Sequence, residues 1–176
     1  MELTDKIHIF QIDFDIEIGP DRKIPRFVNV LLVFGKKITL IDTGVKGSAQ
    51  KIFTYISNCG RNYKEIDSII LSHAHPDHIG SAAEITELTH CKVAAYEDDV
   101  PWIENIQLQN KMRPVPGFLK LVDRPVIVDR KLKDKQVMKA DENITMEIIH
   151  SPGHSRGSIS IFFKEDKILF TITGRS

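Results

Sequence analysis

The sequence predicts an α+β protein built as one domain over residues 1–176. Three observations indicate this fold class. Strand-like alternation fills residues 7–41, helical patterns with short strands between them occupy the middle, and strand patterns return after residue 124. No linker or short repeat divides the chain, and its length is enough for one sizeable core.

The N-terminal part is predicted to be a meander of strands. Apolar and acidic residues alternate over residues 7–18, so one face of this strand should be buried. Gly19-Pro20-Asp21 then indicates a turn, and residues 27–34 and 38–41 should pair through a tight connection at 35–37.

Helices are predicted for the middle of the chain. Apolar residues recur at helical spacing over residues 49–59 before the stop signal Gly60, and a second helix should cover residues 77–88. A third should start where Glu97-Asp98-Asp99 precedes Pro101 and end near Lys111. Further strands are expected at 69–71, 92–95, 126–129, 144–149, 158–163 and 168–172.

The segment from Met112 to Leu119 mixes prolines with apolar residues. Such a segment suits a lid or a wall that faces a substrate, and ordinary packing between elements explains it equally well.

The composition restricts the partners that the protein can have. Lysine and arginine together number 24, as do aspartate and glutamate, which argues against nucleic acid and favours a small molecule as the partner. Cys59 and Cys91 are far apart and outside any CxxC spacing, so we expect a reducing, cytoplasmic setting. We expect no membrane segment and no leader sequence, since no apolar run is long enough.

The chain is organised around the segment from Leu71 to Gly80, which reads Leu-Ser-His-Ala-His-Pro-Asp-His-Ile-Gly. It follows the apolar run 69–71, which predicts a buried strand that ends at a sheet edge. His73 and His75 alternate along extended chain and should point the same way, while Asp77 and His78 lie where Pro76 turns the chain into a helix. Imidazole nitrogens and carboxylate oxygens are suitable ligands for zinc, iron or manganese. The loop is too short for a single ion to bind all four of these side chains, which suggests two adjacent ions.

This segment closely resembles the HxHxDH signature of the metallo-β-lactamase-fold hydrolases. Two further matches lie in the expected order, Ile41-Asp42-Thr43-Gly44 upstream and the segment Ser-Pro-Gly-His-Ser-Arg-Gly-Ser at 151–158 downstream. The resemblance implies an αββα sandwich, in which two mixed sheets pack together and helices flank them. It also implies that the metal ions lie at one sheet edge.

The resemblance assigns ligands residue by residue. His73, His75 and His154 would hold one ion, and Asp77 and His78 would hold the second. Asp42 would lie beneath the ions and orient a ligand histidine, although turn formation is an equally good explanation for this residue.

Several histidines and carboxylates have competing explanations. His150 is an alternative to His154 on chemistry alone, and the Pro-Gly-His match favours His154. Asp77 is also close enough to a helix start to act as a cap. His8 and His90 are expected to be ordinary packed or surface histidines.

Members of this family usually follow a late strand with a Gly-Asp pair whose carboxylate bridges the two ions. Here Arg175 follows Gly174, and guanidinium does not ligate metals. We therefore expect a glyoxalase II-like chain that lacks the C-terminal elements of the fold. An uncovered sheet face would favour a homodimer or aggregation.

The resemblance implies a metal-dependent hydrolase that acts on a small ester, thioester, lactone or related substrate. Zinc is the expected cofactor, with iron or manganese as alternatives, and Asp77 would orient the nucleophilic water. The alternative function is a catalytically impaired protein that holds a single ion through His73, His75 and His154.

Overall fold

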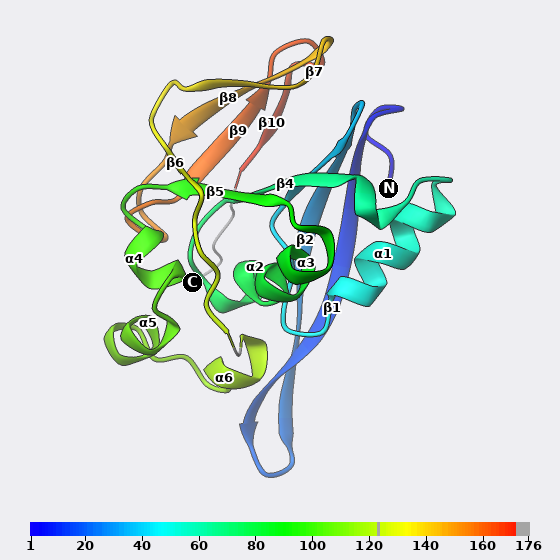
Figure 1. Ribbon diagram of the computed structural model, residues 1–176. Coiled ribbons are helices and arrows are strands. Elements are labelled where there is room, and N and C mark those ends of the chain that lie inside the picture. The colour runs from blue at the N-terminus through cyan, green and yellow to red at the C-terminus, as the bar shows by residue number, and fades with distance from the viewer. Residues whose placement is uncertain (123, 172–176) are drawn as a thin grey trace.

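The computed structural model describes residues 1–122 and 124–171. Its strands form a six-stranded sheet in the order β1-β2-β3-β4-β5-β6 and a four-stranded sheet in the order β10-β9-β8-β7. Figure 1 shows β7 to β10 as a layer of their own beside the strands of the N-terminal half. The first sheet comprises β1 Ile7–Gly19, β2 Arg22–Phe34, β3 Ile38–Ile41, β4 Ile66–Leu71, β5 Lys92–Tyr96 and β6 Arg130–Leu132.

The six-stranded sheet is mixed, as expected. β1, β2 and β3 pair antiparallel, and β3, β4, β5 and β6 pair parallel. The parallel connections run through the helices α1 Ala49–Asn58 and α3 Ala82–Thr89. Because the parallel strands all end at the same edge, the loops that follow β3, β4 and β5 meet there. This edge carries the candidate site.

The second sheet contains β7 Val137–Asp141, β8 Ile144–His150, β9 Ile159–Phe163 and β10 Ile168–Phe170. Its described strands pair only antiparallel, whereas two mixed sheets were predicted. By register Val137, Ile149 and Leu169 share one face of this sheet, and all three are exposed. Arg175, which follows Gly174 where the family usually has an Asp, lies outside the described residues. The end of the predicted strand 168–172 lies outside them too.

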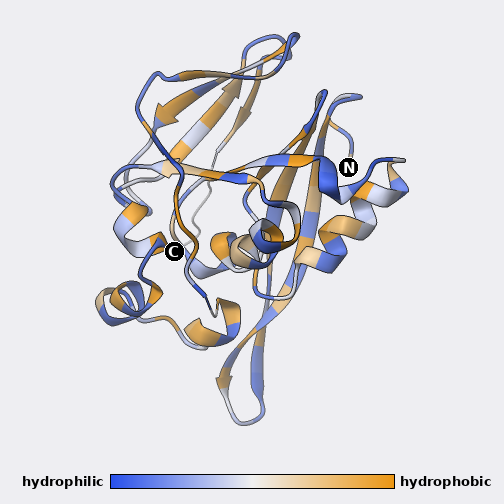
Figure 2. Cartoon of the chain, in the orientation of Figure 1, coloured by the Kyte–Doolittle hydropathy of each residue, from blue (hydrophilic) through white to orange (hydrophobic). Residues whose placement is uncertain are grey.

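Two hydrophobic clusters hold the layers together. One lies between the six-stranded sheet and its helices and includes Leu32, Leu40, Ile52 and Ile69. The other lies between the two sheets and includes Leu31, Ile41, Ile148 and Ile161. Leu31 and Leu32 thus point into different clusters, as strand alternation requires. Figure 2 shows hydrophobic and hydrophilic residues alternating along the long strands β1 and β2.

The predicted helix over 77–88 is divided into α2 Pro76–Ile79 and α3 Ala82–Thr89. The break falls at Gly80, whose N–H donates to the carbonyl oxygen of Gly44 at 2.8 Å. A Cβ on Gly80 would lie 2.4 Å from the backbone nitrogen of Lys46. The close approach of two backbones therefore overrides the helical pattern.

Other boundaries also differ from the predictions. The helix predicted to end near Lys111 is divided into α4 Val100–Ile103 and α5 Ile106–Met112, and Figure 1 shows both grouped with α6 Phe118–Leu121. Residues 126–129 form no strand, and β7 was not predicted. A 3-10 turn, η1 Tyr63–Glu65, precedes β4. Among the described residues no helix is long and apolar enough to cross a membrane.

Candidate metal centre

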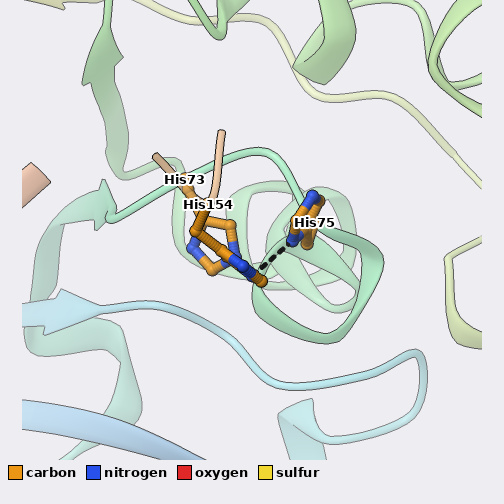
Figure 3. A group of neighbouring side chains, drawn as sticks. All are labelled: His73, His75 and His154. Atoms are coloured by element: carbon orange, nitrogen blue, oxygen red, sulfur yellow. Dashed lines mark hydrogen bonds between the residues drawn. The ribbon is translucent and has the colours of Figure 1, made fainter. Parts of the chain in front are cut away.

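Three histidines from two distant segments meet at the sheet edge. His73 and His75 follow β4 along an extended loop, and His154 lies in the connection between β8 and β9. One nitrogen from each ring can be chosen so that all three lie within 4.8 Å of one another. Figure 3 shows the three rings gathered in one place, with a dashed line between His75 and His154.

The rings are tightly packed. The centroids of His73 and His75 are 4.6 Å apart, those of His73 and His154 4.8 Å apart, and those of His75 and His154 4.3 Å apart. His75 Nδ1 lies 2.7 Å from His154 Nε2. Three imidazoles whose nitrogens approach one another this closely match the ligand set of a transition-metal site.

The hydrogen bonding of this cluster fits a metal ion. His73 and His75 are buried, and the Nε2 atom of each has no hydrogen-bond partner among the described residues. A buried ring nitrogen without a hydrogen-bond partner lowers the stability of the fold, so such atoms are uncommon where no ligand binds. The Nδ1 of His73 lies 3.2 Å from Ser72 Oγ, which leaves its Nε2 as the free donor or acceptor.

The protonation of the cluster also suits a metal. Burial, followed by the charge that His154 carries when protonated, lowers the pKa of His75 to about 3. Burial, followed by His78, lowers the pKa of His73 well below its usual value, and burial followed by Arg113 lowers that of His154. Neutral imidazole is the form that ligates metals, and the lowered pKa values keep these three rings neutral at pH 7.

His78 differs from the other three histidines because it has a carboxylate partner. Its ring centroid is 4.0 Å from that of His73, and its Nδ1 lies 2.7 Å from Asp42 Oδ2. Burial by itself lowers the pKa of His78, but the charge and hydrogen bond of Asp42 outweigh it and raise the pKa. Asp42 thus fixes the orientation of His78, as the resemblance implied for a carboxylate beneath the ions.

Asp42 is completely buried and also supports the start of the ligand loop. Its carboxylate accepts hydrogen bonds from the backbone N–H of Ser72 at 2.8 Å and from the Ser72 hydroxyl at 2.5 Å. Its φ of 63° lies in the left-handed region, which Asp tolerates better than most residues. The left-handed φ of Asp42 fits the turn explanation, and its contact with His78 fits a carboxylate beneath the site, a role that stays a prediction.

Asp77 stands next to the cluster but does not join it. Its side chain is about one-third exposed, and its Oδ2 lies 3.6 Å from His78 Nε2. The predicted cap role has no support, since His75 occupies the N-cap position of α2 and no side chain caps that helix. Asp77 remains open to a water molecule or a substrate.

Histidines outside the cluster have ordinary environments. His150 stacks on Tyr96 with ring centroids 4.1 Å apart, and its Nε2 lies 2.8 Å from the carbonyl oxygen of Arg156. His154, and not His150, therefore reaches the pair in the ligand loop. His8 is buried against Phe34 and Tyr55, and His90 ends α3, so neither belongs to the site.

Three residues that hold the ligand loops were not predicted from the sequence. Asp99 and Gln109 are buried and hydrogen-bond to the backbone of Ala74, and Arg113 donates to the carbonyl oxygen of His154 at 2.5 Å. Asp99 had been interpreted only as a helix start signal. Its position directly after a buried strand that ends at the same sheet edge was the available clue.

The comparison with family models settles the family. Residues 24–172 match the model described as the metallo-beta-lactamase superfamily. The chain belongs to this superfamily. The solved structure of the metallo-beta-lactamase GOB-18 from Elizabethkingia meningoseptica aligns with a TM-score of 0.68 and 32% identity over 77% of this chain and 49% of that one. A class B3 di-zinc metallo-beta-lactamase from an Alaskan soil metagenome aligns with a TM-score of 0.66 and 27% identity, over 77% of this chain and 50% of the other.

Relatives among the curated proteins carry hydrolase names. A probable metallo-hydrolase of Methanocaldococcus jannaschii is 29% identical over 80% of this chain and 64% of its own length. A hydroxyacylglutathione hydrolase of Haemophilus influenzae is 26% identical over 89% of this chain and 70% of its own length. The present chain spans roughly six-tenths of the length of the first of these relatives.

Proposed function

We propose that this chain is, or belongs to, a metal-dependent hydrolase of a small ester, thioester, lactone or related substrate. The observation that carries the proposal is the meeting of His73, His75 and His154 at one sheet edge. The Nε2 atoms of His73 and His75 are buried there without a hydrogen-bond partner among the described residues. Three imidazoles are the protein ligands of several catalytic zinc sites, which keep a fourth position for water. Zinc is the proposed ion, and iron or manganese are alternatives.

Each residue of the site has a proposed task. His73, His75 and His154 hold the first ion, and Asp77 with His78 hold a second where two are bound. Such an ion, when bound, lowers the pKa of a water ligand to about 7 and polarises the substrate carbonyl. Asp77 accepts a hydrogen bond from the attacking water and directs its lone pair toward the acyl carbon. Asp42 keeps His78 in place from below.

The substrate class is proposed from the relatives. Two of them are named hydroxyacylglutathione hydrolases, from Haemophilus influenzae and Rhodopseudomonas palustris. A thioester is therefore our first choice. In its hydrolysis the water oxygen bonds to the acyl carbon, the carbon–sulfur bond breaks, and a carboxylic acid and a thiol result.

A second function follows from one observation. The group of ligands that converges in the described residues is the three-histidine set, whereas the sequence has Arg175 where the family usually has a carboxylate that bridges two ions. The second candidate is accordingly a protein that binds one ion and hydrolyses poorly. The number of ions per chain separates the two functions.

The test combines metal content with turnover. The 176-residue chain, stripped of metal and reloaded with zinc, would be assayed against glutathione thioesters, lactones, β-lactams and phosphodiesters, with His73→Ala and His8→Ala as matched variants. The hydrolase proposal predicts zinc-dependent thioester turnover that His73→Ala abolishes and His8→Ala retains. One tightly held ion without turnover would support the second candidate, and a chain that binds no zinc would overturn both.

The remaining proposals concern the setting of the protein. We propose a small-molecule substrate and no nucleic acid partner, because the chain has equal numbers of acidic and basic residues. A cytoplasmic location is proposed from the two cysteines, both of which are free.

We also propose a homodimer. It would form through the exposed face of the second sheet that carries Val137, Ile149 and Leu169, and sedimentation analysis would test it.

A further inference from the structure

The residue between the two histidines of the ligand loop is held on both sides by buried side chains. The backbone N–H of Ala74 donates to Asp99 Oδ2 at 2.8 Å. The carbonyl oxygen of Ala74 accepts from Gln109 Nε2 at 2.6 Å. Asp99 is 2% exposed and Gln109 is 1% exposed, so both hydrogen bonds are sheltered from water. The two peptide planes that join His73, Ala74 and His75 are therefore fixed in rotation.

Asp99 also holds the loop that carries the third histidine. The same Oδ2 accepts from the hydroxyl of Ser155 at 2.6 Å, and Oδ1 accepts from the backbone N–H of Gly157 at 2.8 Å. Asp99 thus joins two loops that lie 25 and 58 residues away in the sequence. The Asp99 carboxylate therefore accepts three hydrogen bonds and connects the loop after β4 to the loop between β8 and β9.

The fit around this carboxylate is close. A Cβ on Gly157 would lie 2.7 Å from Asp99 Cγ and 2.7 Å from Asp99 N. No other residue type can bring its backbone N–H so near to Oδ1 without moving Asp99. Close contact of this kind transmits the position of Asp99 to the loop that carries His154.

Helix capping does not explain these two residues. Asp99 occupies the N-cap position of α4 but makes no side-chain capping bond there. Gln109 lies in α5 and directs its amide away from its own helix to Ala74, and its Oε1 has no partner among the described residues. Burying a polar side chain to gain one hydrogen bond is costly, which points to a use beyond stability.

We propose that Asp99 and Gln109 are positioning residues that set the directions of the three imidazoles before a metal binds. This inference rests on the proposed metal site and adds to it a second layer of residues, from α4 and α5. Side chains that orient ligands typically contribute 10–100-fold to metal affinity. The segment from Asp99 to Gln109 thereby becomes part of the metal centre, although none of its side chains would ligate the ion.

The main variant is Asp99→Asn, with Asp129→Asn as its control. An amide in place of the Asp99 carboxylate turns an NH2 group toward one of the backbone N–H groups that it now accepts from. Asp129 accepts from the backbone N–H of Val93 at 2.9 Å and from Lys92 Nζ at 2.9 Å, at the opposite end of β5. The control therefore removes a carboxylate that accepts a backbone N–H of β5 at the end of the strand away from the histidines.

Amide hydrogen exchange of the metal-free chain tests the contacts themselves. In Asp99→Asn the amide of Ala74 or that of Gly157, whichever faces the new NH2 group, should exchange at least about 10-fold faster, while that of Val93 stays protected. In Asp129→Asn the amides of Ala74 and Gly157 should keep their protection. Unchanged protection of Ala74 and Gly157 in Asp99→Asn would overturn the proposal.

Metal binding tests the consequence. Zinc affinity, measured by competition with a chromophoric chelator, should fall about 10–100-fold in Asp99→Asn, and the visible spectrum of the cobalt-substituted chain should change. Asp129→Asn should keep both. Gln109→Met, which leaves every hydrogen bond of Asp99 in place, should lower affinity by a smaller factor, and it keeps the test decisive if Asp99→Asn does not fold.

The outcomes separate this inference from the proposed function. If Asp99→Asn and Gln109→Met keep the zinc affinity and cobalt spectrum of the unaltered chain, Asp99 and Gln109 are merely structural and the inference fails while the metal site stands. If the unaltered chain binds neither zinc nor cobalt, the proposed metal site fails, and the positioning role fails with it.

Discussion

Two buried histidine environments in this protein differ in what their ring nitrogens contact. His8 is 6% exposed, and its Nδ1 lies 3.2 Å from the hydroxyl of Tyr55 and 3.9 Å from Cys59 Sγ. Its ring packs against Phe34 with centroids 4.7 Å apart. His73 and His75 are equally buried, yet the Nε2 of each has no partner among the described residues.

The difference shows how a packed histidine can be told from a ligand. A hydrogen-bonded ring in an aromatic setting, such as His8, contributes to the core as any polar aromatic residue does. In the group of three histidines, the buried Nε2 atoms of His73 and His75 have no partner among the described residues, which a bound ion would explain. The following substitutions test this contrast, beginning with the largest expected effect.

Removing a ligand histidine should abolish tight zinc binding. We expect His73→Ala to weaken zinc affinity by more than about 100-fold, because two imidazoles remain where three are needed. His8→Ala should leave zinc affinity unchanged and lower only the free energy of unfolding. Isothermal titration calorimetry on both variants measures this contrast, and equal zinc affinities would refute the ligand role of His73.

Acid should destabilise the metal-free chain through the cluster. The pKa of His75 is about 3 in the folded chain, with burial as the main cause, against about 6.5 when unfolded. Between these values the unfolded chain binds a proton that the folded chain excludes, so the free energy of unfolding falls as pH falls. The slope reaches about 1.4 kcal/mol per pH unit for each such histidine.

Urea unfolding of the unaltered chain and of His75→Gln, compared from about pH 6.5 to about pH 4, isolates this contribution. The variant should show the shallower pH dependence. His78 acts in the opposite sense, because its raised pKa gives stability that is lost as pH rises through that pKa. Identical slopes in both proteins would mean that His75 titrates as it does in the unfolded chain.

Asp42→Asn should cost the protein part of its stability and change the titration of His78. The carboxylate is fully buried and is bonded to Ser72 and His78, so its loss should lower the free energy of unfolding by about 1–3 kcal/mol. The pKa of His78 should fall, since the group that raises it is gone. Imidazole NMR signals followed against pH measure this, and an unchanged His78 pKa would contradict the assigned cause.

The last contrast compares two glycines, of which Gly19 should give the smallest effect. Gly157→Ala places a Cβ against Asp99 and should destabilise the chain by about 1–3 kcal/mol. Gly19→Ala, at the tip of the β1–β2 hairpin with nothing within 4 Å of the new Cβ, should change stability by less than about 0.5 kcal/mol. Thermal unfolding of both variants compares them, and equal stabilities would show that the Asp99 contact yields easily.

The sequence by itself determined strands β1 to β5 of the first sheet and the histidines of the candidate site. Alternation at residues 7–18 predicted β1 because one face of that strand packs on the core while the other meets water. The spacing of His73, His75 and His154 within recognisable motifs predicted which side chains meet. These features are local, since strand period and motif spacing are properties of a short segment alone.

Only the tertiary structure decided the features that depend on distant backbones. The break between α2 and α3 arises where Gly80 approaches Gly44 and Lys46, which no helical pattern reveals. The roles of Asp99 and Gln109 arise because loops after β4, β5 and β8 end at one place. A buried carboxylate binds whichever donors the fold brings to it, so its partners are fixed by the meeting of segments that are remote in sequence.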